Sequence, residues 1–500
     1  MYEDSDFDLD RSQPGNENEL TQDLELETLL RAMSRGDKFL FEVARKALFC
    51  SLTEPAEIVF RQDILADCLA HPEIVRSMYA IAVQAVDGER KIYRGFWDNP
   101  EIILHRSIEV LEFFVGLLKK LTRMAHEHAA QFCSTGFQRL FDMLMTELDD
   151  EYLRAVQAHL KQLRFDGGVL ISARLDRGNK GRDYVIRRDP KPKQSWRQRL
   201  SFFERSPYTL EIADRDEGGM RALGELRGRG VNLAANALAQ SSDHVLSFFT
   251  MLRAELGFYV GCLNLAEQLD AQGEPRCFPA PLPLGERVLS GRGLYDVCLC
   301  LVLKERVVGN DLGADGKSLI MITGANQGGK STFLRSIGLA QLMMQCGMFV
   351  AAERFRAEVG DAIFTHYKRE EDPTMTSGKL DEELSRMSQI VDIARPDSLL
   401  LFNESFSATN EREGAEIAGS IVQALLENDM KGCFVSHSFE LAHRFHSEAR
   451  DNALFLRAER QADGTRTFKL LEGEPLPTSF GEDLYQRVFK GSADDARVVV

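Results

Sequence analysis

Several signals that would place a chain in a membrane or a secretory pathway are missing from this sequence. No apolar run approaches the about 20 residues that a membrane-spanning helix needs. The first six residues, MYEDSD, are acidic and therefore unlike a signal or transit peptide. None of the nine cysteines belongs to a CxxC pair or has a histidine at ligand spacing. We therefore expect a cytoplasmic protein with reduced thiols and no membrane partner, and we expect Cys298 and Cys300 to share one face of a strand.

Positive charge is also scarce, because the formal net charge is −16. This balance argues weakly against a nucleic-acid partner. One segment differs from the rest: residues 174–205 contain eleven Lys or Arg and four Asp or Glu. Such an island can bind phosphates, but a solvated hairpin with a charged tip explains it equally well.

The 500 residues exceed one compact core, and their composition of 44% hydrophobic and 28% charged residues is that of soluble globular domains. Residues 1–22 are acidic and without apolar periodicity, which predicts a disordered tail. In residues 23–165 apolar positions recur at helical spacing, which predicts a helical core domain. The segments with this spacing are 29–48, 58–69, 73–86, 102–125 and 137–163.

The pattern changes after residue 165. Residues 166–269 contain two short strand-like runs around the turn GNKG, followed by long helical periodicity, which predicts a basic β-hairpin and long lever- or clamp-like helices. A proline-rich stretch then marks a boundary. In residues 270–500 short apolar runs alternate with helical patterns, which predicts an α/β domain with a largely parallel sheet.

The most informative motif is GANQGGKS at residues 324–331, which fits the phosphate-loop pattern G-x-x-x-x-G-K-S/T. An apolar run of strand type precedes it and an amphipathic helix follows. Backbone N–H groups of such a loop surround phosphates, the lysine reaches the β- and γ-phosphates, and the hydroxyl binds Mg²⁺. The predicted nucleotide contacts are Gly324, Asn326, Gly328, Gly329, Lys330, Ser331 and Thr332.

Two later strands end in polar residues that suit this site. The run SLLLFNE ends in Asn403 and Glu404, where many phosphate-loop ATPases have Asp-Glu. Asn403 can accept from a metal-bound water but brings no charge, so weak metal binding or slow turnover is expected. Glu404 is the predicted general base. The run GCFVSH ends in His437, which can contact a γ-phosphate.

In this order, the segments GANQGGKST, LLLFNES and FVSHSFEL resemble the ATPase domain of the MutS family. Further similar segments are VVGND before the loop, TSFG at 478–481, and RQ at 61–62 in the helical core; Thr409 and Gly414 match a Thr and a Gly of the family. The resemblance implies a helical core and lever followed by an α/β P-loop ATPase domain of ABC/MutS type with a C-terminal dimerisation segment.

Departures from the family pattern are equally informative. Ala325 and Gln327 replace Pro and Met of the loop, and SFSA at 405–408 replaces Ile-Gly-Arg-Gly. The Ser-Thr-Phe signature that reaches the partner's nucleotide corresponds to SGKLDEE at 377–383, which leaves Ser377, Lys379 and Thr409 as the candidates for contacts across the dimer. No aromatic residue precedes Asn310 where the family stacks adenine, and no mismatch-reading domain with a Phe-x-Glu wedge is found.

The resemblance implies a homodimeric ATPase that uses ATP and Mg²⁺ and acts on duplex, mismatched or branched DNA through a clamp, in mismatch repair or in recognition of a DNA structure. DNA contacts are then expected at Arg174, Arg177, Lys180, Arg182, Arg187, Arg188, Trp196 and Arg197. Two alternatives stay open: an ABC-type ATPase with a non-DNA partner, although no Leu-Ser-Gly-Gly-Gln signature is present, and an attenuated nucleotide-binding scaffold.

Overall fold

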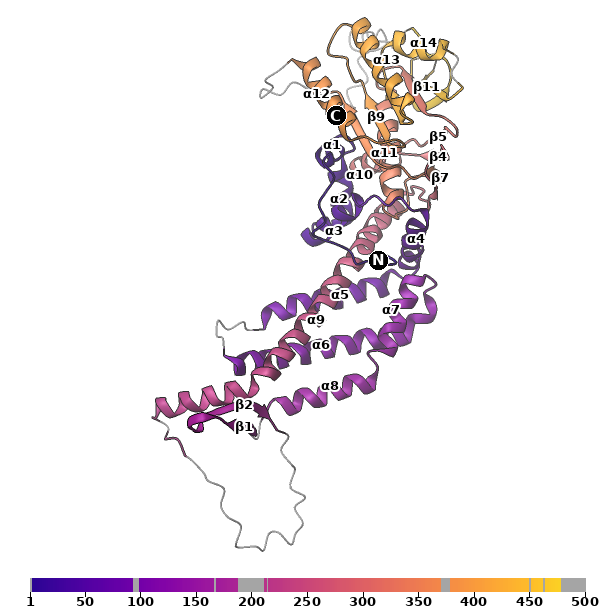
Figure 1. The fold of residues 1–500 in the computed structure, drawn as a ribbon. Helices are drawn as coiled ribbons and strands as arrows, with labels where there is room; N and C mark the ends of the chain where they lie inside the picture. The colour runs from indigo at the N-terminus through magenta and orange to yellow at the C-terminus, as the bar shows by residue number, and fades with distance from the viewer. Residues whose placement is uncertain are drawn as a thin grey trace, which may run out of the picture. The chain divides into compact units, whose positions relative to one another are not determined.

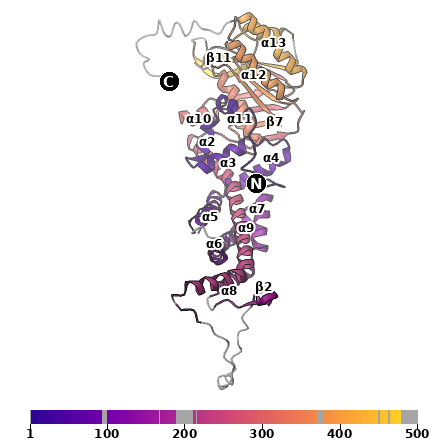
Figure 2. The ribbon, with the colours of Figure 1, turned by 60° about the vertical axis from the view of Figure 1, so that its left-hand side comes forward.

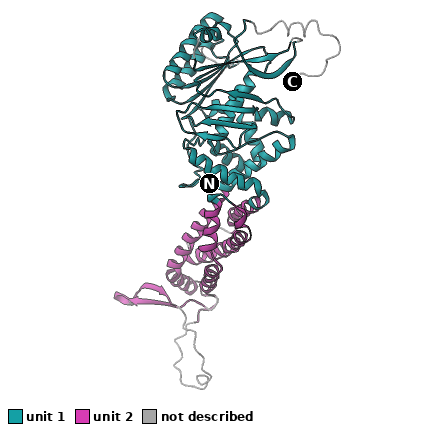
Figure 3. Ribbon diagram, turned by 90° about the vertical axis from the view of Figure 1, so that its right-hand side faces the viewer, with its two compact units in different colours: residues 1–75, 133–136, 254–500 teal, residues 76–132, 137–253 magenta. Residues whose placement is uncertain are grey.

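A computed structural model describes residues 2–92, 99–165, 168–187, 211–213, 215–369, 378–448, 451–461 and 464–477. The contacts between residues divide the chain into two compact units (Figure 3). Unit 1 comprises residues 1–75, 133–136 and 254–500, and unit 2 comprises residues 76–132 and 137–253. The four-part division predicted from the sequence stays a prediction.

Unit 2 is built mainly from helices. Its elements are α5 (Pro72–Lys91), α6 (Pro100–His128), η1 (Ala129–Gln131), α7 (Thr135–Thr146), α8 (Asp150–Leu163), β1 (Ile171–Leu175), η2 (Arg177–Asn179), β2 (Gly181–Ile186) and the part of α9 (Glu217–Gln272) up to residue 253. The predicted helix at 137–163 is divided in two, because Asp149 caps a new helix by accepting from the Tyr152 N–H at 2.7 Å.

The core of unit 2 follows from apolar spacing along α6. Leu104, Ile108 and Leu111 lie on one face of the helix, since they are separated by about one and two turns. They pack with the buried Leu160 of α8 and with apolar side chains of α9. The hairpin β1–β2 also reaches α9, and a Cβ at Gly230 would lie 2.3 Å from the Ile171 side chain.

Helix α9 is the one helix among the described residues that is long and apolar enough to cross a membrane by length and composition alone. In its most apolar 18-residue window, 61% of the residues are buried inside the protein. Core helices of soluble proteins pass the same test, so this helix is weak evidence for a membrane.

Unit 1 contains a six-stranded sheet of order β12-β11-β6-β10-β9-β8 (Figure 1). The strands are β6 (Leu319–Gly324), β8 (Ile363–Tyr367), β9 (Leu399–Asn403), β10 (Lys431–Val435), β11 (Ala453–Arg460) and β12 (Arg466–Glu472). All neighbours are parallel except β11 and β12. The carboxyl ends of β6, β10, β9 and β8 therefore lie side by side, which is where α/β sheets bind ligands.

Helices cover both faces of this sheet, as strand alternation requires (Figure 1 and Figure 2). On one face Leu400 and Phe402 pack into a core with α12 (Lys379–Ile393), α13 (Glu411–Glu427) and α14 (Phe439–Ser447). On the other face lies α11 (Lys330–Gln345), where a Cβ at Gly338 would lie 2.5 Å from Leu401. The buried apolar strands predicted from the sequence are thus the central strands of the sheet.

A second sheet of order β3-β7-β4-β5 adjoins α11. Its strands are β3 (Ala280–Leu282), β4 (Leu289–Leu294), β5 (Asn310–Gly313) and β7 (Arg354–Glu358). Between β4 and β5 the chain forms α10 (Val297–Leu303), which carries Cys298 and Cys300. The prediction of a strand for these cysteines is wrong, because Asp296 accepts from the Leu299 N–H at 3.0 Å and starts a helix.

The N-terminal part of unit 1 adds α1 (Glu17–Asp23), α2 (Leu26–Ser34), α3 (Lys38–Leu48) and α4 (Pro55–Ala70). Residues 2–22 differ from the predicted disordered tail, because a few of their side chains find partners far away in sequence. Phe7 is buried, Tyr2 places its ring 4.6 Å from the guanidinium of buried Arg61, and Asn16 donates to the Ile363 carbonyl at 2.7 Å.

Candidate nucleotide-binding site

The predicted phosphate loop lies between β6 and α11, as its motif requires. Gly324 and Gly329 have φ angles of +107° and +86°, which a side chain would strain. Close packing adds a second demand, since a Cβ at Gly324 would lie 2.8 Å from the Ala458 nitrogen, and one at Gly328 would lie 2.7 Å from the Ala458 Cβ. The glycines therefore let the loop turn closely beside β11.

Lys330 is held by the loop itself. Its Nζ donates to the carbonyl oxygens of Gly324 at 3.1 Å and Ala325 at 2.9 Å. Burial lowers the pKa of Lys330 to about 8, and the charge of Arg466 acts in the same direction, while Glu404 opposes it. A phosphate bound at this position would give the Lys330 ammonium group a negatively charged partner.

Ser331 and Asn403 meet at the carboxyl edge of the sheet. The Ser331 hydroxyl donates to the Asn403 Oδ1 at 2.8 Å. Both predicted metal ligands are thus brought together, but both are neutral oxygens. Among the described residues no group of three or more His, Cys, Asp or Glu side chains could hold a metal ion. These donors fit a Mg²⁺ ion whose remaining ligands are phosphate oxygens and water.

Glu404 and His437 also lie together, with Oε1 of the glutamate 2.5 Å from Nε2 of the histidine. The hydrogen bond from His437 lowers the pKa of Glu404; burial opposes this shift, and the charges of Lys330 and Lys368 support it. Glu404 has a φ of +55°, and its N–H donates to the Val435 carbonyl at 3.0 Å. The predicted base is therefore a carboxylate held in a defined position at the end of β9.

Two cations of this site were missed by reasoning from the sequence. Lys368 directly follows β8, and its backbone N–H donates to the Asn403 backbone carbonyl at 3.0 Å. Nε of Arg466, at the start of β12, donates to the Asn326 carbonyl of the loop at 3.2 Å. Neither residue belongs to a motif, and only the order of the strands brings Lys368 beside Asn403 and Arg466 beside the loop.

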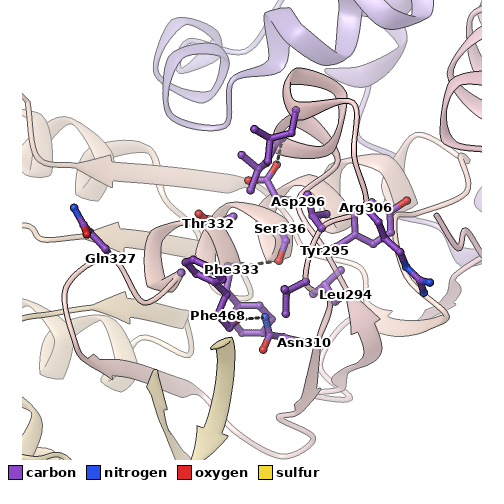
Figure 4. Close-up of a pocket in the computed structure, with 15 residues that line it drawn as sticks. Leu294, Tyr295, Asp296, Arg306, Asn310, Gln327, Thr332, Phe333, Ser336 and Phe468 are labelled. Atoms are coloured by element: carbon purple, nitrogen blue, oxygen red, sulfur yellow. Dashed lines mark hydrogen bonds between the residues drawn. The ribbon is translucent and has the colours of Figure 1, made fainter. Parts of the chain in front are cut away.

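A cavity of about 450 Å³ adjoins the loop and is lined mostly by apolar side chains (Figure 4). Figure 4 shows Phe333, Phe468 and Asn310 close together, with Gln327 at the far end. Asn310 joins two strands here, because its Nδ2 donates to the Phe468 carbonyl at 3.1 Å and its Oδ1 accepts from the Leu470 N–H at 2.7 Å. Thr332 also lines the cavity.

The candidates for contacts across a dimer are described in part. Lys379 is the first residue of α12, and the Thr409 hydroxyl donates to Glu413 at 2.7 Å. Ser377 and the segment at 478–481 lie outside the described residues. Their roles stay predictions.

The basic hairpin in unit 2 is antiparallel, with exposed arginines that are paired within it. Arg174 lies 4.0 Å from Asp183, and Arg182 lies 3.8 Å from Asp176. Nε of Arg187 donates to the Ser172 hydroxyl at 2.8 Å. Among the other predicted DNA contacts, Arg177 and Lys180 lie in the turn, whereas Arg188, Trp196 and Arg197 lie outside the described residues.

Comparison with known proteins explains this arrangement. Residues 53–272 match the family model described as the MutS2 N-terminal domain, and residues 320–488 match the one described as MutS domain V. The chain belongs to the MutS family. Most of its N-terminal half matches the MutS2 type of N-terminal domain, a subtype that the sequence motifs alone had not indicated.

Several curated members of the MutS family are similar to parts of the chain. A DNA mismatch repair protein MutS of Thermus thermophilus is 30% identical over 251 residues, which cover 50% of this chain and 29% of the relative. Endonuclease MutS2 of the same species is 34% identical over 131 residues, or 26% of this chain and 18% of the relative. MutS protein homolog 4 of Mus musculus is 30% identical over 152 residues, which cover 30% of this chain and 16% of the relative. Each match spans less than a third of the relative's length.

The structure shows the backbone of the loop after β9, where the sequence departs from the MutS-family motif. Phe406 stands where the family has a glycine, and its φ of +61° keeps a backbone conformation that glycine favours. Gly414, which matches a family glycine, lies directly against this loop, since a Cβ there would lie 2.4 Å from the Phe406 carbonyl oxygen. The loop after β9 thus keeps a tight shape despite its different sequence.

Proposed function

We propose that this protein binds and hydrolyses ATP and couples the bound nucleotide to DNA. One observation carries the proposal. Lys330, the Ser331–Asn403 pair and the Glu404–His437 pair lie at the carboxyl edge of one parallel sheet. Phosphoryl transfer to water requires a cation that binds the phosphates, a pair of metal ligands and a base, and these three groups supply them.

Each group of residues at the site has its own proposed role in ATP binding and hydrolysis. Loop N–H groups and Lys330 bind the β- and γ-phosphates, and Arg466 adds positive charge beside them. Glu404 orients the attacking water and accepts its proton. His437 holds Glu404 through a hydrogen bond and can exchange this bond for one to the γ-phosphate. Mg²⁺, bound with ATP near Ser331 and Asn403, would neutralise phosphate charge.

The apolar cavity beside the loop suits the base of the nucleotide. It opens between the loop and β12, and the half-exposed ring of Phe468 supplies a stacking surface from a different strand than the family position before Asn310. Base stacking on an aromatic ring contributes roughly 1–3 kcal/mol in nucleotide complexes. This arrangement supports a purine nucleotide as ligand.

The DNA part of the proposal rests on family membership and on the basic hairpin. We propose a homodimer in which Lys379, Thr409 and Ser377 face the partner's nucleotide, and in which DNA lies against the hairpin of unit 2. Duplex, mismatched or branched DNA are all candidates, and the protein would act in a compartment that holds DNA and ATP, such as the cytoplasm.

A second candidate is favoured by Asn403. Since neither Asn403 nor Ser331 carries a charge, the site could bind ATP and scarcely hydrolyse it, acting as a nucleotide-controlled scaffold. An ABC-type ATPase with a non-DNA partner is the remaining alternative.

The deciding experiment measures ATP turnover with and without duplex, mismatched and branched DNA, beside binding to each DNA over a salt titration. Lys330→Ala and Glu404→Ala serve as site controls. Turnover that DNA stimulates and that both variants abolish supports the proposal. ATP binding without turnover favours the scaffold, and a lack of response to every DNA excludes the DNA part.

A further inference from the structure

His366 is a buried histidine with a partner on each ring nitrogen. It lies on β8, pairs in register with Phe402 of β9, and is 1% exposed. Its Nδ1 lies 2.8 Å from the Ser405 hydroxyl oxygen, and its Nε2 lies 2.9 Å from the Glu383 carbonyl oxygen. One imidazole therefore connects the residue after Glu404 with helix α12.

The chemistry of the partner fixes the direction of the hydrogen bond at Nε2. A carbonyl oxygen only accepts, so Nε2 must carry the proton and donate to Glu383. Burial lowers the pKa of His366 to about 4, so the ring is neutral near pH 7 and Nδ1 holds a lone pair. The Ser405 hydroxyl also lies 2.5 Å from the His366 backbone carbonyl oxygen, so its one proton is shared between that oxygen and Nδ1. The serine at position 405 therefore contacts both the ring and the backbone of His366, and an apolar residue would leave the ring nitrogen unpaired.

The same ring also supports the next residue of the loop. Phe406 stacks on His366 with ring centroids 5.0 Å apart and an angle of 19° between the planes. Glu404 and Phe406 both have positive φ angles, which strain the backbone of residues with side chains. Conformations of this kind persist when surrounding contacts determine them, and His366 supplies two such contacts.

The other end of this connection lies near the start of α12. Glu383 is in the first turns of the helix, which begins at Lys379, a candidate for contact with a partner's nucleotide. His366 therefore links the loop that carries the base of one site to the element expected to reach the other site.

We propose that His366 is a positioning residue that fixes Glu404 by tying the loop at 404–406 to helix α12. This inference rests on the proposed ATPase function. Because the tie acts on the water-activating carboxylate and leaves the phosphate loop untouched, its loss lowers kcat while the affinity for ATP stays the same. A displacement of about 1 Å at a reacting group lowers rates by up to about 100-fold, so a decrease of about 10- to 100-fold is expected.

Three variants of the full chain separate the two ends of the tie. Ser405→Ala removes the hydroxyl and leaves the ring in place. His366→Gln places an amide near Nε2, which keeps the bond to Glu383 and loses the one to Ser405. His366→Asn places an amide near Nδ1, with the opposite result. All three should lower kcat and leave the dissociation constant for a fluorescent ATP analogue within about twofold.

Non-additivity gives a sharper test. Ser405→Ala and His366→Gln both remove the contact between Nδ1 and the Ser405 hydroxyl, so the decrease in kcat of the double variant should be smaller than the product of the two single decreases. Ser398→Ala is the matched control, because it removes a buried hydroxyl directly before β9, whereas Ser405 lies just after that strand. It should leave kcat unchanged.

The outcomes distinguish this inference from the function on which it rests. Unchanged kcat in Ser405→Ala and His366→Gln would overturn the tie while ATP hydrolysis by the wild type still stands. A decrease that the Ser398→Ala control shares, with lowered Tm and ATP affinity, would also overturn it, because that pattern marks general damage. A wild type that neither binds nor hydrolyses ATP would instead reject the proposed function.

Discussion

The Ser331 hydroxyl donates a 2.8 Å hydrogen bond to the Asn403 Oδ1, which joins the phosphate loop to the end of strand β9. In phosphate-loop ATPases an aspartate at the second position contributes a negative charge to the metal site. Here the geometry is kept and the charge is missing. The missing charge should therefore weaken metal binding and slow hydrolysis, whereas the ability to bind ATP is kept.

Asn403→Asp should strengthen Mg²⁺ binding and raise turnover, because one charge is added at a distance of a few ångströms from the metal. We expect the Mg²⁺ concentration at half-maximal turnover to fall by roughly tenfold or more. The measurement is ATP turnover over a Mg²⁺ titration. Asn428→Asp, at the exposed end of α13, adds the same charge away from the site and should have no effect. An unchanged Mg²⁺ dependence of Asn403→Asp would contradict this prediction.

Glu404→Gln should abolish most hydrolysis and keep ATP binding. The amide retains an oxygen near His437 but cannot accept a proton from water, and loss of a general base lowers rates by about 100- to 10,000-fold. Single-turnover hydrolysis and ATP affinity are measured together. Glu411→Gln, at the exposed first residue of α13, is the control. Wild-type hydrolysis by Glu404→Gln would show that another group activates the water.

ATP affinity should decline as the pH rises through the pKa of Lys330, which burial lowers to about 8. Below this pH the lysine is charged and binds phosphate; above it the neutral amine must first take up a proton. Binding at pH 9 should thus be roughly tenfold weaker than at pH 7. Isothermal titration calorimetry at pH 7, 8 and 9 measures this directly. In Lys330→Arg, which stays protonated, the residual affinity should not follow this profile.

DNA binding should depend on the charge balance of the hairpin. Lys180→Ala should weaken binding to all DNA forms alike and reduce the salt slope by about 0.9 if its charge contacts one phosphate. Asp176→Asn should act in the opposite direction, because it releases Arg182 from an ion partner 3.8 Å away. Fluorescence anisotropy over a salt titration measures both. Arg412→Ala, on α13 of unit 1, is the control, and an equal loss in that variant would argue against the hairpin.

The sequence predicted those parts of the site that are continuous strings of residues. The loop at 324–331 was predictable because strand, glycines and helix follow one another, and Glu404 and His437 because apolar strands precede them. Lys368, Arg466 and His366 were not predictable, since their neighbours depend on the order of strands in the sheet. The helical run at 29–48 was divided for a local reason, because Gly36 adopts a φ of +86° that ends one helix before the next begins.

Phe406 occupies a glycine position of the MutS family with the backbone conformation of a glycine. Its ring packs in the core of the sheet and stacks on His366, whose Nδ1 lies 2.8 Å from the Ser405 hydroxyl oxygen. Substitution of Phe406 by glycine would relax the backbone and remove the stacked ring, and substitution of Ser405 by isoleucine would leave a lone pair unmatched. These three positions should therefore have changed as a set during the divergence of this protein, and homologues should carry all three residues or none.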